Sequence, residues 1–262
     1  MATVYKFSFD ARSLQNLPLE ERVLLLLLGY AANQITMLQR LIWYCTNGPL
    51  HDYEAEQLGN LAQSSMLLRL LVGVLSESWR LVSTRYLQSK LGREYGPLLS
   101  PTGAQSLGNL KKQFGKGSLI TSIRNNYAFH FPDNSDLEAA FEAAAKSADA
   151  GQNWSAYFSR YNANTLFQLS EFVLNRGVML QIGVEDELES HRLMMKELGS
   201  AANDVVVFAQ SFFAATWKRR FEEAEPPAQQ IAPGADPDAV RLPFIVEPPR
   251  SSRNHTALNT ND

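Results

Sequence analysis

The chain has 262 residues, of which 45% are hydrophobic and 19% charged, so it has the composition of an ordinary globular protein. A chain of this length can bury a sizeable core, as one large domain or two small ones. Its formal net charge of −3 excludes a generally basic nucleic-acid-binding coat, although a local basic patch remains compatible with it.

Residues 4–9 alternate, with Tyr5, Phe7 and Phe9 on one side, which predicts a short strand or an extended arm laid across the rest of the protein. The first residues lack the charged start and apolar run of a signal peptide. The single cysteine, Cys45, can form no intrachain disulfide, which suits a reducing compartment. We therefore expect a cytoplasmic protein.

The first long helix is predicted over residues 19–46, because apolar residues recur at alternating steps of four and three from Leu24 to Cys45. Residues 23–45 are nearly long enough to span a membrane. An arginine at a bilayer centre costs about 2.5–3.5 kcal/mol, however, so we expect a bundle helix and no membrane span. Four polar residues support this interpretation: Asn33, Gln34, Gln39 and Arg40.

A second long helix is predicted after a turn at Asn47-Gly48-Pro49, with Asp52 as its N-cap. Its apolar seam runs from Leu58 to Tyr86, so the two helices should form an antiparallel hairpin. Extra apolar residues widen the face of this helix and suggest a surface for dimerisation: Leu67, Leu70, Leu71 and Val74.

Between residues 95 and 132 there is no Asp or Glu, whereas Lys111, Lys112, Lys116 and Arg124 add four positive charges. Such a local excess can attract phosphate groups. Four charges alone are more typical of a solvated helix edge. Their proximity to the residues described next favours a nucleic-acid-binding surface.

The next helix is predicted to begin after Ser118, a natural N-cap, and to end just before Pro132. His130 would then lie in the last turn, where the helix dipole favours a protonated imidazole. Arg124 would project from the edge of the packed face, and Asn126 could reach the His130 ring from four residues away. His130 is expected to face the packed side with three apolar residues: Leu119, Ile123 and Tyr127.

Downstream, helices are predicted over residues 136–146, 164–181 and 185–221, with a loop at 150–153. His191 is expected to be a hydrogen-bonded packing residue and not a metal ligand, since no second His or Cys lies at metal-ligand spacing. After residue 222 the chain becomes rich in proline, which predicts a disordered tail over 223–262. Within it, residues 242–246 could dock onto the bundle or a partner.

Arg124-Asn125 followed by His130, with Ile123 before and the ending Ala128-Phe129-His130-Phe131, resembles the Arg-x(4–6)-His motif of the HEPN superfamily. The resemblance implies an all-α fold, here a HEPN-like helical bundle domain over residues 1–222. It also implies a metal-independent and cofactor-free endoribonuclease, of the kind found in toxin–antitoxin, antiviral-defence or RNA-processing systems.

Further expectations follow from the resemblance. His130 would be the general acid and base, Arg124 would hold the scissile phosphate, and Asn125 and Asn126 would position the phosphate or the imidazole. Because one histidine cannot serve as a separate acid and base, two motifs would face each other across the cleft of a homodimer. The expected partners are RNA, a second copy and an antitoxin or other protein. The expected product is a 2′,3′-cyclic phosphate.

Three other interpretations remain open. Arg124 could pair with a surface carboxylate while His130 closes the end of a helix, which is the usual arrangement for an isolated Arg and His. The chain could be a non-catalytic helical module that binds RNA or a partner protein. It could also be an oligomeric scaffold built on the two long helices, with no nucleic acid involved.

Overall fold

The structure is a computed structural model that describes residues 2–8, 11–46, 53–147, 154–221, 227–232, 234 and 236–247. The described residues are mostly helical, and the predicted all-α bundle is confirmed. The turn expected at Asn47-Gly48-Pro49, the cap expected at Asp52 and the loop expected at 150–153 lie outside the described residues.

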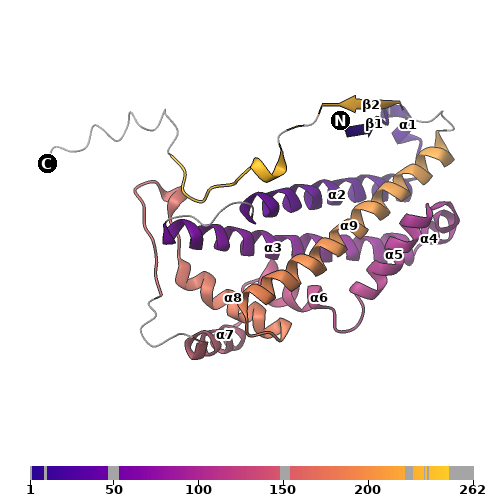
Figure 1. Cartoon of the computed structure of the whole chain (residues 1–262). Coiled ribbons are helices and arrows are strands. Elements are labelled where there is room, and N and C mark those ends of the chain that lie inside the picture. The colour runs from indigo at the N-terminus through magenta and orange to yellow at the C-terminus, as the bar shows by residue number, and fades with distance from the viewer. Residues whose placement is uncertain are drawn as a thin grey trace.

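Three long helices form the centre of the bundle: α2 (Leu19–Thr46), α3 (Glu54–Val82) and α9 (Glu187–Arg220). Helices α2 and α3 lie antiparallel, as expected, and α9 crosses both of them obliquely (Figure 1). The predicted seam of α2 is buried because its positions face α3 and α9. Leu24, Leu28, Ile35 and Ile42 are all at most 2% exposed.

Shorter helices surround this centre, with α5 packed along α9 and α7 on α8. Two five-residue segments, η1 and η3, are π-helical, and η2, η4 and η5 are 3₁₀ turns. Their bounds are α1 (Ala11–Gln15), η1 (Ser83–Leu87), α4 (Lys90–Tyr95), η2 (Gly96–Leu98), α5 (Pro101–Gln113), α6 (Leu119–Ile123), η3 (Arg124–Ala128), α7 (Asn134–Ser147), η4 (Asn162–Asn164), α8 (Gln168–Ile182) and η5 (Pro237–Ala239).

Helix α8 begins four residues later than the sequence predicts. Tyr157 and Leu166 form an antiparallel bridge, in which each backbone N–H donates to the other's carbonyl, at 2.7 and 2.8 Å. The bridge holds Leu166 in a strand-like pairing, and α8 begins only at Gln168, after the N-cap Phe167. The pairing also gives a structure to the stretch after Trp154, for which the sequence pattern suggests none.

The widened apolar face of α3 is covered by other helices of the same chain. Leu67 and Leu71 are 8% and 2% exposed, and Leu70 and Val74 pack against the main core. Leu67 and Leu71 are therefore core residues, Leu70 and Val74 are half-buried at the edge of that core, and a dimer contact at this edge stays a prediction. The helix that continues from α3 into η1 is long and apolar enough to cross a membrane, but 56% of its most apolar window is buried inside the protein, as in the core helix of a soluble protein.

The two ends of the chain meet in a small sheet. Strand β1 (Ala2–Tyr5) pairs antiparallel with β2 (Ala228–Ile231), so that Ala2 faces Ile231 and Tyr5 faces Ala228. A strand near the N-terminus is thus confirmed, but it covers residues 2–5 and not the expected 4–9. Phe7 follows it and packs edge-on against Phe213, with ring centroids 5.1 Å apart.

Parts of the region expected to be disordered make defined contacts. Besides β2, the Leu242 N–H donates to the Tyr44 carbonyl at 3.0 Å, and the Phe244 ring lies directly against the backbone of Gly59. Docking of residues 242–246 onto the bundle is therefore confirmed, while the disorder expected over 223–262 stays a prediction. Residues 222–226 and 248–262 lie outside the described part.

A buried carboxylate joins the N-terminal end of α2 to the C-terminal end of α9. Glu21 is 2% exposed and accepts hydrogen bonds from Arg220 Nε at 2.8 Å and from the Tyr95 hydroxyl at 2.9 Å. Burial alone would raise the pKa of Glu21, but these hydrogen bonds outweigh it and the pKa lies below its usual value. The three groups fix the end of the bundle opposite the candidate site described next.

Candidate functional site

The helix that carries the Arg/His motif starts where the sequence predicts and ends earlier. Ser118 is its N-cap and accepts a hydrogen bond from the Thr121 N–H at 3.4 Å. Helix α6 has only five residues, and the π-helical turn η3 follows and ends at Ala128. The prediction of a helix running up to Pro132 is therefore wrong, and His130 lies beyond the helical turns, where the dipole argument does not apply.

The π-helical turn η3 is wider than an α-helical turn, and this changes which of the side chains that follow are buried. Tyr127 packs so closely on α8 that a Cβ added at Gly177 would lie 2.4 Å from its hydroxyl oxygen. In the same way, a Cβ added at Gly73 of α3 would lie 2.4 Å from the ring of Phe129. Both contacts need a glycine on the facing helix, and they fix the chain on either side of Ala128. The helical backbone ends at Ala128, so His130 does not continue the buried face of the helix and is exposed. The prediction that it faces the packed side is wrong.

Arg124 has a carboxylate partner on α3. Its Nη2 lies 3.3 Å from Glu77 Oε1, and its Nη1 donates to Asn125 Oδ1 at 3.4 Å. The side chain is one-third exposed, so the guanidinium remains accessible from solvent. This pairing is the arrangement expected for an Arg that has a structural role.

The structure does not bring Arg124 and His130 into contact. Among the described residues, none forms a hydrogen bond or ion pair with His130, including Asn126, which the helical spacing placed beside the ring. The reason is the early end of the helix, since an i, i+4 contact requires helical backbone throughout. Asn125 is exposed and Asn126 half-buried on the same turn.

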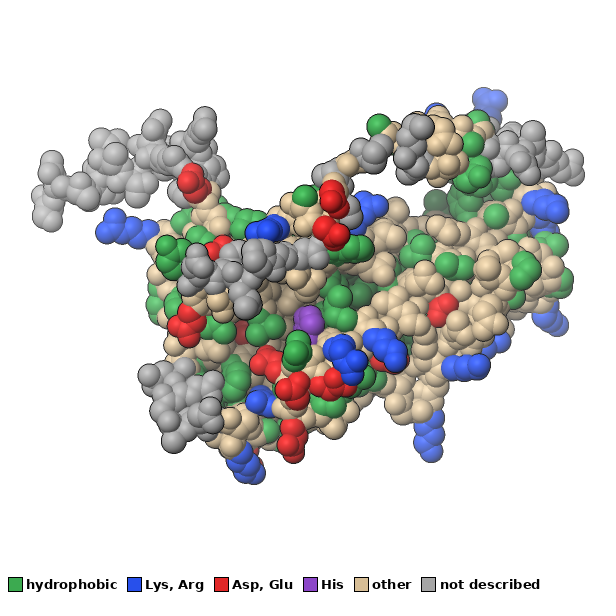
Figure 2. Space-filling view, in the orientation of Figure 1, with side chains coloured by type: hydrophobic (Ala, Val, Ile, Leu, Met, Phe, Trp, Pro, Cys, Tyr) green, Lys and Arg blue, Asp and Glu red, His purple; other side chains and the backbone are tan. Residues whose placement is uncertain are grey.

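Lys111, Lys112 and Lys116 are all exposed, at the end of α5 and in the turn that follows. Figure 2 shows Lys and Arg side chains projecting from the end of the molecule formed by α4 and α5. The ten residues of α6 and η3 lie in the chain between these lysines and the segment that carries His130. The lysines and the motif thus border one edge of the bundle without forming a single cluster.

His130 lies on a groove with a different arginine. The groove has a volume of about 370 Å³ and lies between α3, α8 and the segment from Tyr127 to Pro132. Arg69 of α3 and Glu171 of α8 line it, and apolar walls come from three further residues: Met66, Leu70 and Leu174. Tertiary packing therefore places Arg69 and Glu171, which are distant in the sequence, in the same groove as His130.

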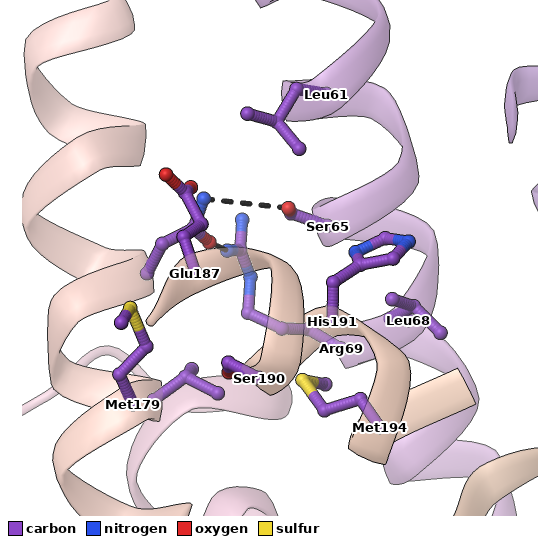
Figure 3. A pocket seen from close by; sticks show the side chains of 11 residues that line it. Leu61, Ser65, Leu68, Arg69, Met179, Glu187, Ser190, His191 and Met194 are labelled. Atoms are coloured by element: carbon purple, nitrogen blue, oxygen red, sulfur yellow. Dashed lines mark hydrogen bonds between the residues drawn. The ribbon is translucent and has the colours of Figure 1, made fainter. Parts of the chain in front are cut away.

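Arg69 is the centre of a buried polar network. Its side chain is 10% exposed, and it donates to Glu171 Oε2 at 2.7 Å and to Asn175 Oδ1 at 3.0 Å. Asn175 in turn donates to Ser65 Oγ at 3.4 Å, the dashed contact near the top of Figure 3. In sequence, Arg69 is the one charge among the apolar residues 66–75. A charge buried in such a run requires a partner. The lone charge is therefore the sequence signal that could have identified Arg69.

On its other side Arg69 lines a small pocket of about 30 Å³ that includes Ser190 and His191 of α9 (Figure 3). The His191 ring lies beside Leu68 and does not point toward Arg69. Burial lowers the pKa of His191, so its imidazole is neutral near pH 7. No cluster of three metal-ligating side chains occurs within the described ranges. His191 is half-buried, as expected of a packing residue, but no described residue forms the expected hydrogen bond with its ring.

Comparison with known proteins gives no match: no protein-family model, no curated protein and no solved structure matches this chain. The function is therefore argued from the geometry of the site.

Proposed function

We propose that the protein is a metal-independent endoribonuclease of the HEPN type, with His130 as the general acid and base. The observation that carries this proposal is the exposure of His130 at the mouth of an open groove, on a segment anchored by Tyr127 and Phe129. An exposed imidazole can reach a bound substrate and can both accept and donate a proton through its ring nitrogens.

The chemistry is attack of a ribose 2′-OH on the adjacent phosphate. One group removes the 2′ proton, another protonates the leaving 5′ oxygen, and cations stabilise the charge that develops on phosphorus. The products are a 2′,3′-cyclic phosphate and a 5′-OH. Arg124 supplies the charge, because a guanidinium presents two parallel donors to phosphate. Asn125 and Asn126 position the phosphate, and the exposed Lys111, Lys112 and Lys116 bind the flanking backbone.

Each chain offers a single exposed histidine in this groove among the residues that the structure describes. We therefore propose that two copies form a homodimer in which one His130 acts as base and the partner's His130 as acid. A cytoplasmic nuclease of this kind acts in toxin–antitoxin, antiviral-defence or RNA-processing systems, with an antitoxin or other protein as a further partner.

One observation favours a second candidate, a non-catalytic helical module that binds RNA or a partner protein. Arg124 is paired with Glu77 and makes no contact with His130. An arginine in such a pair stabilises the surface without acting on a phosphate.

The experiment that separates the candidates is incubation of the purified protein with mixed RNA in EDTA, beside the variants Arg124→Ala and His130→Ala. Arg80→Ala is the matched control, because Arg80 also pairs with Glu77 but is more exposed. EDTA-resistant cleavage that is lost in the two motif variants and kept in Arg80→Ala supports the nuclease. RNA binding without cleavage selects the module, and the absence of both leaves an oligomeric scaffold.

A further inference from the structure

The segment from Phe129 to Phe131 presents an unusual pair of aromatic rings beside His130. Phe129 is held against Gly73, whereas Phe131 is 97% exposed. An exposed Phe forgoes all the stabilisation that burial of its ring would bring. The segment is also fixed downstream, because Asp133 Oδ1 accepts a hydrogen bond from the Asp136 N–H at 2.8 Å at the start of α7. Phe131 therefore projects into solvent from a short linker that is fixed at both ends.

The Glu171 carboxylate presents an oxygen with no described donor to the groove next to Phe131. Glu171 uses Oε2 to bind Arg69, and no described residue donates a hydrogen bond to its Oε1. The Glu171 side chain is 26% exposed and lines the groove. An ionised carboxylate can only accept hydrogen bonds, so whatever meets this oxygen must be a donor. The apolar walls around it suit a flat ring.

Building on the proposed nuclease, we propose that this groove is a base-binding subsite for single-stranded RNA. An unpaired nucleobase stacks on Phe131, and its exocyclic amino group donates to Glu171 Oε1. Aromatic side chains are common stacking platforms for unpaired bases, and acidic side chains accept hydrogen bonds from the amino group of cytosine.

Two substrate preferences follow from this geometry. Cytosine and adenine carry an amino group where uracil carries a carbonyl oxygen, so uracil places an acceptor against the Glu171 acceptor. The site therefore favours cytosine over uracil. A base in a duplex is paired and stacked within the helix, so double-stranded RNA cannot enter the groove.

The test is the binding of fluorescently labelled oligocytidine, oligouridine and a C·G duplex to the full chain in EDTA, measured by fluorescence anisotropy. All probes carry 2′-O-methyl groups, because without a free 2′-OH the proposed nuclease cannot cleave them. We expect the order oligocytidine, then oligouridine, then duplex. Phe131→Ala should weaken oligocytidine binding by about 5- to 150-fold, as expected for the loss of one stacked base, and Phe131→Trp should restore it. Tyr53→Ala is the control, since Tyr53 is also well exposed, at 74%, but lies at the start of α3.

Glu171→Gln tests the hydrogen bond, because glutamine keeps an oxygen for Arg69 and adds an N–H that uracil can accept from. The ratio of oligocytidine to oligouridine affinity should fall toward one. If this variant does not fold, Phe131→Ala alone decides. Unchanged binding in Phe131→Ala overturns the subsite, and so does an unchanged ratio in a folded Glu171→Gln. Conversion of a dimer to a monomer by Phe131→Ala would also overturn it, by placing the ring in an interface.

Together with the cleavage assay on mixed RNA, this binding test keeps the two proposals apart. If the protein cleaves RNA without preferring cytosine and without needing Phe131, the subsite proposal is wrong and the nuclease proposal stands. If the protein binds oligocytidine through Phe131 but does not cleave RNA, the subsite proposal stands and the nuclease proposal is wrong. A protein that binds no RNA loses both.

Discussion

Arg124 Nη2 and Glu77 Oε1 lie 3.3 Å apart, and the two side chains are 33% and 36% exposed. Ion pairs with this exposure contribute only about 0–1 kcal/mol to stability. The pair therefore orders the guanidinium without strongly holding it, and a phosphate group can replace the carboxylate at little cost. In the proposed nuclease, Glu77 would therefore compete with the RNA phosphate for Arg124.

The first prediction concerns Glu77→Gln. Removing the competing charge should increase RNA affinity by several-fold, while the free energy of unfolding changes by less than about 1 kcal/mol. Anisotropy with labelled RNA measures the affinity, and urea denaturation measures the stability. Combining Glu77→Gln with Arg124→Ala is the control, since the gain should vanish when the guanidinium is absent. The same gain in that double variant would show that general charge, and not Arg124, is responsible.

The second prediction concerns the buried pair of Arg69 and Glu171. Glu171→Leu leaves the Arg69 guanidinium buried without its carboxylate, and should lower the free energy of unfolding by about 3 kcal/mol. Replacing both residues, with Arg69→Met and Glu171→Leu together, should recover most of the loss, because an apolar pair needs no partner there. Urea denaturation of the three proteins measures this. A double variant as unstable as the single one would show that the ion pair itself stabilises the bundle.

The third prediction is a pH dependence caused by His191. Because burial lowers its pKa, the unfolded chain takes up a proton near pH 6.5 while the folded chain does not. The stability contribution is complete above about pH 6.5 and is lost progressively as the pH falls toward the lower pKa of the folded state. His191→Gln should remove this part of the slope. Chemical denaturation at pH 7.5 and pH 5 detects it as a smaller acid destabilisation in the variant, and equal slopes in the two proteins would contradict the assignment.

The fourth prediction concerns Tyr86, which is 1% exposed and packs edge-on against Phe208 with ring centroids 5.1 Å apart. Its hydroxyl has no hydrogen-bond partner among the described residues, and burial raises its pKa to about 12. Tyr86→Phe removes a buried polar atom and should stabilise the protein by about 1 kcal/mol in thermal denaturation. Tyr95→Phe is the matched control, because its hydroxyl donates to Glu21 at 2.9 Å and its loss should destabilise. Destabilisation in both variants would show that Tyr86 has a partner after all.

The sequence predicts the long helices well and the motif helix poorly. The bounds of α2 agree with the predicted 19–46 because its apolar seam repeats over the whole length of the helix. Helix α6 has only five residues, too few for periodicity to locate its end, and the contacts of Tyr127 with Gly177 and of Phe129 with Gly73 decide the backbone there. For the same reason the exposure of His130 cannot be read from its spacing to Arg124.

What the sequence determined by itself is local: the all-α class, the three long helices, the Ser118 cap and the exposed lysines, all of which depend on residues within a few positions of one another. What only the tertiary structure decided is the pairing of charges, with Arg124 on Glu77 and Arg69 on Glu171, 102 positions away. A helix satisfies its own backbone within four residues, so its pattern shows which face is buried but not which neighbour will cover that face. The groove beside His130 exists because α3 and α8 meet there, and no local pattern contains that contact.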